Sequence, residues 1–577
     1  MKVSMRDQIH DEKSSTHPSP AEGSLIHARL PPKDINWWRS AVLYQVYPRS
    51  FCDARGDGIG DIKGLIQRLT EIKSLGVDAI WICPFFKSPM EDFGYDIEDH
   101  CAVDPLFGQQ EDVYELIKTA HTLGLRVLID LVISHTSERH PWFKESRLSR
   151  DSEWSDYYVW ADPLSDGSPP NNWLSIFGGS AWKWDTRRRQ YYLHNFLVSQ
   201  PDLNFHNPDV QDHLLEVARF WLELGVDGFR LDTVNFYFHD QQLRHNPPAH
   251  QHDNTSAHES NPYGWQEHLY DKNRPEVSAF LERLRALLDT FPGSVSLGEI
   301  GESPSRSLDL LVEYTQPNRL HLCYSFDLLA PKGDARYWRG VISRFEDRAA
   351  SQGSSSWPCW AFSNHDVTRA ATRLCPQDGN VRATGELLLA LLLSLRGTPC
   401  IYQGEELALP EAEVPYDLLV DPYGIEFWPD FKGRDGCRTP YPWNDNSGAG
   451  FTRGEPWLPI SDTHQTLNFN HQDQDTQSTL NIARTLIRLR ASSLALQRGS
   501  IELINNDSSD HDDDALLAFV RTYEDEYILC VFNPSTERLR LVYSDLSSYE
   551  ILSAARGVNF DAEHLVLPPQ TWAFLQR

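Results

Sequence analysis

Three carboxylates stand directly behind short apolar stretches in different parts of the chain. Asp232 ends the stretch GFRLD, Glu299 ends SVSLGE and Asp366 ends AFSNHD. Cleavage of a glycosidic bond with retention uses two such groups about 5–5.5 Å apart, one as nucleophile and one as acid and then base. One carboxylate in such a place is as readily a helix cap or an ion-pair partner, but three on separate strands favour a shared site.

These stretches can meet only if they are strands of one barrel, and the chain has the pattern of such a barrel. In three segments an amphipathic helix closes on Leu-Gly, at Gly76, Gly124 and Gly225, and an apolar strand follows at once. Glycine supplies the left-handed helix cap, and unbroken apolar strands are typical of parallel sheets covered by helices. Five further strand candidates are VLYQVYP, SVSLGE, LCYSFD, PCWAFSN and TPCIYQG.

Eight strands that alternate with helices predict an α/β fold, a (β/α)8 TIM barrel whose chemistry lies at the C-terminal strand ends. An open, doubly wound sheet is the alternative, but no Gly-rich phosphate fingerprint supports it. We expect the barrel at 36–134 and 196–497, an inserted domain B at 135–195 after the third strand, and a C-terminal all-β domain, a β-sandwich, at 498–577. Residues 1–35 are polar and contain Pro and Ser, which predicts a disordered tail.

Composition limits the partners and the location. The formal charge of −29 argues against nucleic-acid binding, which needs clustered Lys and Arg. The nine cysteines show neither CxxC pairs nor zinc-site spacing, and they are typical of reduced thiols. The N-terminus MKVSMRDQIHDEKSS has no apolar core of the kind that a signal peptide needs, and the longest apolar run, LLLALLLSLRG from Leu387, is too short for a membrane span. We therefore expect a cytoplasmic protein with a small, uncharged partner and no membrane partner, and the sequence leaves its oligomeric state open.

Seven motifs occur in order along the chain: DFGYDI at 92–97, DLVISH at 130–135, QPDLNF at 200–205, GFRLDTVNF at 228–236, GE at 298–299, SNHD at 363–366 and GRDGCRTP at 433–440. In this order they resemble glycoside hydrolase family 13, the α-amylase clan, and within it the bacterial α-glucosidases related to oligo-1,6-glucosidase. The resemblance covers the chain from Trp37 to the C-terminus. It implies that Asp232 is the nucleophile, Glu299 the general acid/base and Asp366 the transition-state stabiliser.

The same resemblance places four polar residues around a bound glucose. His135 and His365 match histidines that hydrogen-bond the sugar. Asp96 and Arg434 match the pair that clamps the non-reducing glucose and closes the pocket behind it. Such a pocket implies that the enzyme removes single glucose units from a chain end.

Other residues bear on the charge and the shape of the site. Arg230 lies two residues before Asp232 on the same strand, so both side chains face the same way and its charge should keep Asp232 ionised. Thr233 stands where, in relatives, Val accompanies α-1,6 cleavage and a small or hydroxyl residue accompanies α-1,4 cleavage. Phe177 and Phe196 resemble aromatic walls of the sugar site, with plain packing as the alternative. The segment of about 40 residues after Val234 is expected to wall off the pocket.

The stretch DARGDGIGD resembles a loop that binds Ca²⁺ or Mg²⁺ in relatives. The matching positions are Asp53, Arg55, Asp57 and Asp61, with the carbonyl of Ile59. Oxygen ligands suit such cations, but the Arg55 side chain supplies none. Its guanidinium either points to solvent beside a bound metal or folds in and pairs with the aspartates in place of the metal. Asp61 is in either case a natural N-cap for the next helix.

The expected function is that of a retaining, exo-acting α-glucosidase on short α-1,4-linked, maltose-like sugars, with transglucosylation and no catalytic cofactor. The alternatives are an oligo-1,6-glucosidase and a sucrose- or maltose-acting glucosyltransferase or isomerase, such as a sucrose isomerase or trehalose-forming mutase. A catalytically dead transporter-subunit relative is disfavoured because all three carboxylates are present.

Overall fold

The protein is described by a computed structural model that covers residues 30, 34–253, 257–304, 306–331, 333–352, 356–506, 515–561 and 564–577. The expected tail at residues 1–35 lies almost wholly outside these ranges.

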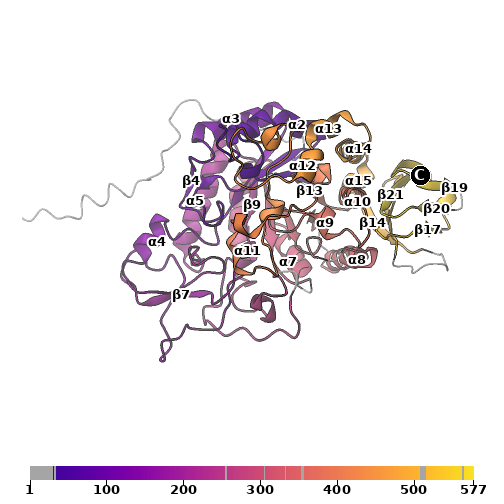
Figure 1. The fold of residues 1–577 in the computed structure, drawn as a ribbon. Helices are drawn as coiled ribbons and strands as arrows, with labels where there is room; N and C mark the ends of the chain where they lie inside the picture. Colours follow the sequence, from indigo (N-terminus) through magenta and orange to yellow (C-terminus); the bar gives the residue numbers. More distant parts are fainter. Residues whose placement is uncertain are drawn as a thin grey trace, which may run out of the picture.

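Eight parallel strands form the centre of the molecule (Figure 1). Their order is β11-β10-β9-β5-β2-β1-β13-β12, and a parallel bridge between Cys323 and Pro358 closes the ring between β11 and β12. The strands are β1 (Leu43–Val46), β2 (Ala79–Ile82), β5 (Arg126–Leu131), β9 (Gly228–Leu231), β10 (Val295–Ile300), β11 (Leu322–Ser325), β12 (Cys359–Trp360) and β13 (Thr398–Tyr402). The predicted (β/α)8 barrel is confirmed, and each of the eight predicted stretches contains one of these strands.

Most helices between and after the strands contribute side chains to the main hydrophobic core, and α11 and α12 are the exceptions among those given below. Those between strands are α1 (Ile62–Gln67), α2 (Leu69–Leu75), α3 (Gln110–Thr122), α5 (Pro208–Leu224), α6 (Val277–Asp289), α7 (Ser307–Tyr314), α8 (Ala335–Ser351), α9 (Ala370–Arg373) and α10 (Val381–Ser394). After β13 come α11 (Pro422–Glu426), α12 (Asp462–Thr466), α13 (Phe469–Gln474), α14 (Thr479–Ser492) and α15 (Leu494–Arg498).

Helix α5 shows how the sequence specifies these elements. The Asn207 side chain accepts the N–H of Asp209, and Pro208 occupies the first turn, where its missing N–H costs nothing. Trp221 is fully buried on the inner face, where its ring contacts those of Phe85 and Phe86. Gly225 ends the helix at φ 116°, a conformation that favours glycine. The chain then enters β9, the strand that carries Asp232.

The long connection between β5 and α5 contains α4 (Pro141–Ser146) and a small antiparallel sheet of order β6-β8-β7. Its strands are β6 (Trp160–Ala161), β7 (Trp182–Asp185) and β8 (Gln190–Leu193). Trp173, Trp182 and Leu193 belong to a separate core cluster in this region. A second small hairpin, β3 (Phe86–Lys87) with β4 (Asp99–Val103), carries residues 88–98 across the top of the barrel.

The chain ends in a domain of two antiparallel sheets, of orders β14-β15-β16-β21-β18 and β17-β20-β19. The strands are β14 (Ser500–Ile504), β15 (Leu517–Tyr523), β16 (Glu526–Asn533), β17 (Leu539–Leu541), β18 (Glu550–Ala554), β19 (Asn559–Asp561), β20 (His564–Leu567) and β21 (Thr571–Gln576). Side chains of both sheets share one core cluster. The predicted C-terminal all-β domain is confirmed, and in Figure 1 it lies on the side of the molecule away from β7.

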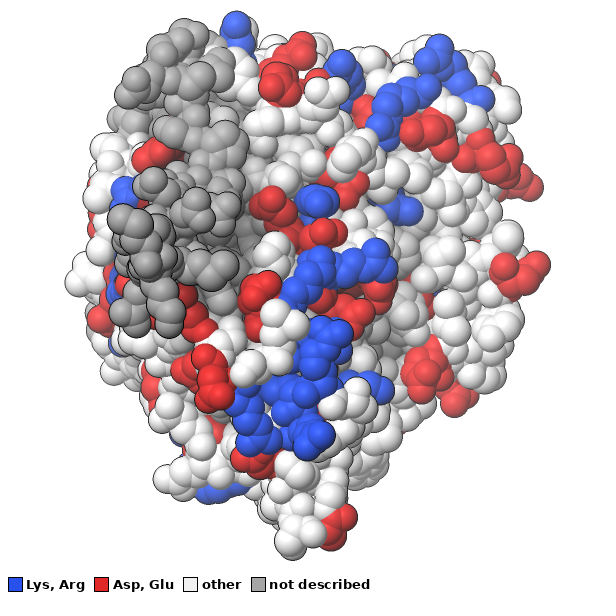
Figure 2. Space-filling view, turned by 90° about the vertical axis from the view of Figure 1, so that its left-hand side faces the viewer, with Lys and Arg blue, Asp and Glu red and all other residues white. Residues whose placement is uncertain are grey.

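The surface carries charges of both signs. Figure 2 shows Lys and Arg interspersed with Asp and Glu on one face, although the net charge is −29. None of the helices in the described ranges is both long and apolar enough to cross a membrane.

Candidate active site

The three predicted carboxylates meet at one end of the barrel. Asp232 follows β9 directly, Glu299 lies near the end of β10, and Asp366 follows β12. All three line the same cavity of about 270 Å³. Loops that follow β2, β5, β9, β10, β11, β12 and β13 complete its wall. The C-terminal ends of the strands thus form the site, as expected for this architecture.

Arg230 joins two of these carboxylates at the floor of the site. Its Nη1 lies 2.6 Å from Asp232 Oδ1 and 2.7 Å from Asp130 Oδ1, and its Nη2 lies 2.6 Å from Glu299 Oε2. The side chain is wholly buried and does not line the cavity. Tyr324 completes the network, because its hydroxyl accepts from Arg230 Nη2 (2.9 Å) and donates to Glu299 Oε1 (3.0 Å). Arg230 therefore holds Asp130, Asp232 and Glu299 in fixed positions relative to one another.

Burial raises the pKa of both Asp232 and Glu299. It raises the pKa of Glu299 to about 7, opposed by Arg230 and reinforced by Asp232 and Asp366. It raises the pKa of Asp232 to about 6, again opposed by Arg230. Arg230 alone was expected to hold Asp232 ionised. Desolvation outweighs the effect of Arg230, so the pKa of Asp232 is raised and not lowered. Its value of about 6 still leaves Asp232 mostly ionised at neutral pH, as a nucleophile requires.

Asp366 has the opposite environment. Burial would raise its pKa, but His365, Arg438 and Arg434 lower it by more, so the pKa lies well below its usual range. Arg438 Nη2 lies 2.7 Å and Arg434 Nη1 3.3 Å from Asp366 Oδ1. Asp366 is therefore a permanent anion beside two carboxyls of higher pKa.

The two predicted histidines lie at different depths. His135 lines the cavity, and its Nε2 lies 3.1 Å from the Tyr95 carbonyl oxygen while its Nδ1 contacts Ser134 Oγ (2.8 Å). His365 is wholly buried and lies outside the lining, where its Nε2 contacts the Tyr95 hydroxyl (2.6 Å) and Asp366 Oδ2 (3.2 Å). Burial lowers the pKa of His135 to about 4 and that of His365 to about 3, so both rings are neutral at neutral pH.

The predicted aromatic residues line one side of the cavity. Phe177 and Phe196 are in edge contact, with ring centroids 5.9 Å apart. The Arg434 guanidinium lies 5.1 Å from the Phe177 ring centroid, and His135 lies 5.2 Å from Phe196. These rings therefore contact polar groups of the site, which plain packing inside the inserted region does not require.

Comparison with known proteins decides the family. The model of the α-amylase catalytic domain matches residues 45–499. A probable alpha-glucosidase of Rhizobium meliloti (strain 1021) is 55% identical over 507 residues, which cover 87% of this chain and 90% of the relative. An oligo-1,6-glucosidase of Parageobacillus thermoglucosidasius is 35% identical over 532 residues, 86% of this chain and 90% of the relative.

The chain belongs to the α-amylase family, glycoside hydrolase family 13.

Solved structures agree with this assignment. The crystal structure of the alpha-glucosyl transfer enzyme XgtA superposes with a TM-score of 0.89 at 50% identity and covers 94% of this chain and 99% of its own. The trehalulose synthase MutB from Pseudomonas mesoacidophila MX-45 superposes with a TM-score of 0.83 at 32% identity, with 94% and 99% covered. The protein is therefore a glycoside hydrolase with the fold of this family over nearly its whole length.

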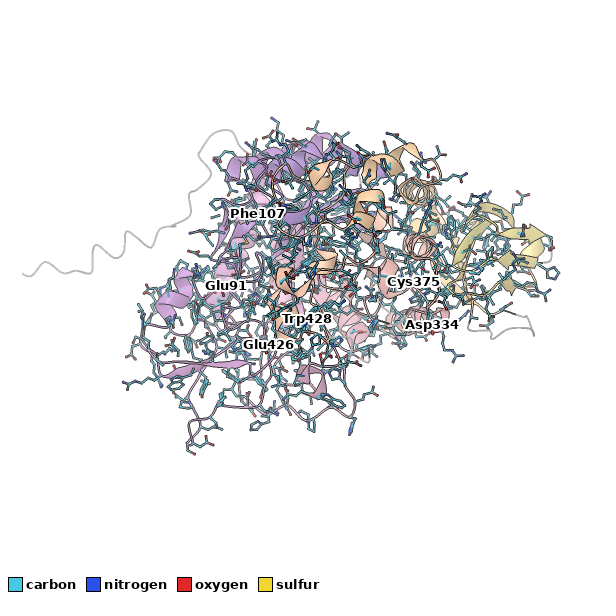
Figure 3. The ribbon with its side chains drawn as sticks, viewed as in Figure 1. Glu91, Phe107, Asp334, Cys375, Glu426 and Trp428 are labelled. Carbon is cyan, nitrogen blue, oxygen red and sulfur yellow. The ribbon has the colours of Figure 1, made fainter. Side chains whose placement is uncertain are left out.

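One predicted pair of this family-13 site is wrong. Arg434 pairs with Asp92 (Nη2 to Oδ1, 2.8 Å) and Asp421 (2.7 Å), and not with Asp96. Figure 3 labels Glu91, which precedes Asp92 in the chain, and Glu426 and Trp428, whose numbers fall between Asp421 and Arg434. Asp92 lines the cavity, whereas Asp96 does not.

Asp96 holds the loop that presents Asp92. Its carboxylate accepts the N–H groups of Glu91 (2.9 Å) and Asp92 (3.0 Å) and the Ser88 hydroxyl (2.9 Å). Both aspartates belong to the motif DFGYDI. The motif therefore predicts the loop correctly, but Asp92, and not Asp96, faces the cavity.

Thr233 adopts a left-handed conformation at φ 42° directly after Asp232. Its N–H donates to Glu299 Oε2 (3.1 Å), and its Oγ1 lies 3.1 Å from Ser134 Oγ and 3.3 Å from Asp232 Oδ2. The segment after Val234, which is expected to wall off the pocket, contributes Ala257 and His258 to the cavity wall.

Sequence reasoning missed several other members of the site. They are Asp92, Tyr95, Phe236, Tyr324, Phe326, Leu329, Pro331, Asp421, Tyr423 and Arg438. The motifs already held Asp92, Tyr95, Phe236 and Arg438, whereas Phe326, Leu329 and Pro331 lie in an irregular stretch after β11 without a recognisable pattern.

The predicted metal-site residues lie together in the loop between β1 and α1, as part of a closed hydrogen-bond network. Asp57 Oδ1 accepts the Ile59 N–H (3.1 Å), and Asp61 caps α1 by accepting the Gly64 N–H (2.7 Å). Arg55 contacts both Asp57 and Asp61. In the described residues no group of three or more His, Cys, Asp or Glu is arranged to hold a metal. Ca²⁺ and Mg²⁺ bind oxygen ligands, and the positively charged Arg55 side chain, which has none, does not fit such a site.

Exchange of the two aspartates of the DFGYDI motif should have different effects. Asp92→Asn removes a charge that faces the cavity, and we expect KM for a short α-glucoside to rise about tenfold or more with little change in melting temperature. Asp96→Asn leaves buried N–H donors without an acceptor and should cost about 1–3 kcal/mol of stability, with a smaller effect on KM. Steady-state kinetics and thermal denaturation measure both. A large KM change in a fully stable Asp96→Asn would restore Asp96 to the site.

Proposed function

We propose that this family-13 enzyme is an exo-acting, retaining α-glucosidase. It releases glucose from the non-reducing end of short α-1,4-linked glucosides such as maltose, and it also transfers glucose to other acceptors. The observation that carries the proposal is that Asp232 and Glu299 contact one guanidinium at the floor of a single cavity, which Asp366 also lines.

The proposed mechanism has two displacements. Asp232 Oδ1 pairs with Arg230, so Oδ2 attacks the anomeric carbon while Glu299 gives its proton to the departing glycosidic oxygen. The product is a β-glucosyl ester of Asp232 and a free alcohol. The Glu299 carboxylate then takes a proton from water, whose oxygen attacks the same carbon and releases glucose and the Asp232 carboxylate. The Asp366 anion stabilises positive charge at the sugar ring in both steps.

The charged cluster around Arg434 supports exo action. Asp92, Asp421 and Asp366 contact its guanidinium, and the cluster joins the loops after β2 and β13 across the cavity wall. Charged groups of this kind bind the hydroxyls of a terminal sugar with directed hydrogen bonds. A longer chain would have to displace the ion pairs to pass through this side.

Glucosyl transfer is the second candidate activity, as in a sucrose isomerase, a trehalose-forming mutase or another sucrose- or maltose-acting glucosyltransferase. The cavity wall after β11 is apolar, with Phe326, Leu329 and Pro331. Such a wall disfavours ordered water and accommodates the apolar face of an acceptor alcohol. The solved relatives named an alpha-glucosyl transfer enzyme and a trehalulose synthase agree with this alternative.

We also propose that the enzyme works in the cytoplasm. All nine cysteines are free thiols, and eight of them are buried. A reducing compartment keeps thiols in this form. The proposed steps require no catalytic cofactor.

Product analysis on maltose, isomaltose, sucrose and trehalose tests the proposal. We expect glucose and transfer products from maltose, release of α-glucose first, and lower activity on isomaltose. Asp232→Asn should still fold, because Asp130 and Glu299 continue to pair with Arg230, and it should lose about 10⁴-fold or more of the turnover, because it removes the nucleophile. Isomerised sucrose as the main product would favour the second candidate, and β-glucose as the first product would exclude retention.

The pH profile follows from the two carboxyls. Below a pH of about 6 Asp232 takes up a proton and loses its nucleophilic form, and above about 7 Glu299 loses the proton that the leaving group needs. We expect kcat/KM for maltose to peak between these values. Glu299→Gln should remove the alkaline limb when it is assayed on an aryl glucoside whose leaving group needs no proton. Activity that rises steadily into the alkaline range would contradict these roles.

Replacement of Thr233 tests the linkage preference. Thr233→Val keeps the shape but loses the hydroxyl that contacts Ser134 and Asp232. We expect the ratio of isomaltose to maltose activity to rise about tenfold, a change of about 1.4 kcal/mol in relative barrier height. Thr233→Ser is the matched control and should leave the ratio near that of the wild type. An unchanged ratio in Thr233→Val would place linkage selection in other residues.

A further inference from the structure

The loop between β1 and α1 contains a positively charged side chain, Arg55, next to its aspartates. We infer that the Arg55 guanidinium takes the place of the divalent metal that the family resemblance implies for this loop. The inference concerns the stability of the barrel top and does not depend on the proposed substrate.

The three aspartates of the loop already have partners that a metal ligand would have to give up or share. Asp53 accepts the N–H groups of Gly56 (2.6 Å) and Gly58 (2.8 Å) and the hydroxyl of Thr452 (2.6 Å). Both of its oxygens thus accept hydrogen bonds without a cation. Neither Arg55 nor a metal is needed to hold Asp53 in place.

Asp61 is engaged in the same way at the other end of the loop. Its Oδ1 caps α1, and its Oδ2 accepts the N–H groups of Ala54 (3.1 Å) and Arg55 (3.2 Å). These bonds bend the loop so that the Arg55 side chain starts beside the carboxylates. Burial raises the pKa of Asp61, and this shift is opposed first by the N–H groups of Gly64, Arg55 and Ala54 and then by the Arg55 charge.

The guanidinium occupies the space between the remaining acceptors. Nη2 lies 3.2 Å from Asp57 Oδ2, and Nε lies 3.6 Å from Asp61 Oδ2. Nη1 donates to the Pro105 carbonyl (2.9 Å) and Nη2 to the Leu106 carbonyl, next to Phe107, which Figure 3 labels. Carboxylates and backbone carbonyls are the oxygen ligands that Ca²⁺ prefers. One side chain therefore collects acceptors from two segments about fifty residues apart, as a bound cation would.

A divalent ion cannot share this position with the guanidinium. Binding would place two cations within a few ångströms of each other, and the repulsion would offset the gain from the carboxylates. Displacement of Arg55 to solvent would break the bonds to Pro105 and Leu106. The wild-type loop is therefore complete without metal.

The loop matters because it supports the rear of the active site. The Gly58 carbonyl accepts the N–H of Trp457, and a Cβ on Gly58 would lie 1.8 Å from the Glu455 carbonyl oxygen. Trp457 contacts Tyr47, with ring centroids 6.4 Å apart, and Tyr47 stacks on His365 at 5.9 Å. Loss of the Arg55 guanidinium should thus loosen the segment around Trp457, which is packed behind the catalytic carboxylates.

The test compares the wild type with Arg55→Asn in EDTA, CaCl₂ and MgCl₂. Melting temperature and bound metal, measured after gel filtration, are the readouts, so neither depends on activity. We expect a metal-free wild type whose melting temperature is the same in all three buffers. In EDTA, Arg55→Asn should melt about 1–2 °C lower. CaCl₂ should restore its stability with about one ion bound per chain, because Asn supplies the missing oxygen.

Arg453→Asn is the matched control. Arg453 donates to the Ala54 carbonyl (3.2 Å) in the same loop, but it forms none of the contacts that join Arg55 to the aspartates. Its loss should leave the protein insensitive to metal. Three results would overturn the inference: stoichiometric Ca²⁺ or Mg²⁺ in the wild type, an unchanged melting temperature of Arg55→Asn in EDTA, or a destabilised Arg55→Asn that neither metal restores.

Discussion

The site depends on one buried positive charge. Arg230 is wholly buried, and it can remain so only because Asp130, Asp232 and Glu299 surround it. Removal of any partner from such a cluster leaves an uncompensated charge in a poorly solvated place, which is costly. Arg230 in turn fixes the two carboxylates relative to each other. Three neighbouring strands, β5, β9 and β10, must therefore keep their register for the site to exist.

The rest of the cavity is built around this fixed pair by loops. Asp366 lies between the guanidiniums of Arg434 and Arg438, which come from the segment after β13. Arg434 reaches the loop after β2 through Asp92. The result is an alternation of charge across the mouth of the barrel, in which Asp366 contacts two guanidiniums whereas Asp232 and Glu299 share one. Different acidities of chemically similar groups follow from that distribution.

The sequence predicts the barrel and its three carboxylates well because both depend on strands. An apolar strand has a fixed direction and its end can be read from the letters, so Asp232, Glu299 and Asp366 were placed correctly. Loops have no such regular pattern of apolar residues. Asp92 and Asp96 are four residues apart in one turn, and only the folded backbone decides which points to Arg434 and which accepts the N–H groups of the turn. The direction of the Arg55 side chain was undecided for the same reason.

The barrel closes between β11 and β12 through a single bridge, and this closure lies next to the apolar part of the cavity wall that follows β11. Strands β11 and β12 meet through the Cys323–Pro358 bridge, and the neighbouring loops are joined by Arg373, which donates to the Leu328, Ala330, Phe362 and Thr368 carbonyls. Backbone carbonyls bind a guanidinium whatever side chains the loops carry. Phe326 and Leu329 can therefore be exchanged without loss of the bonds that join the two loops, and the carboxylates stay in place.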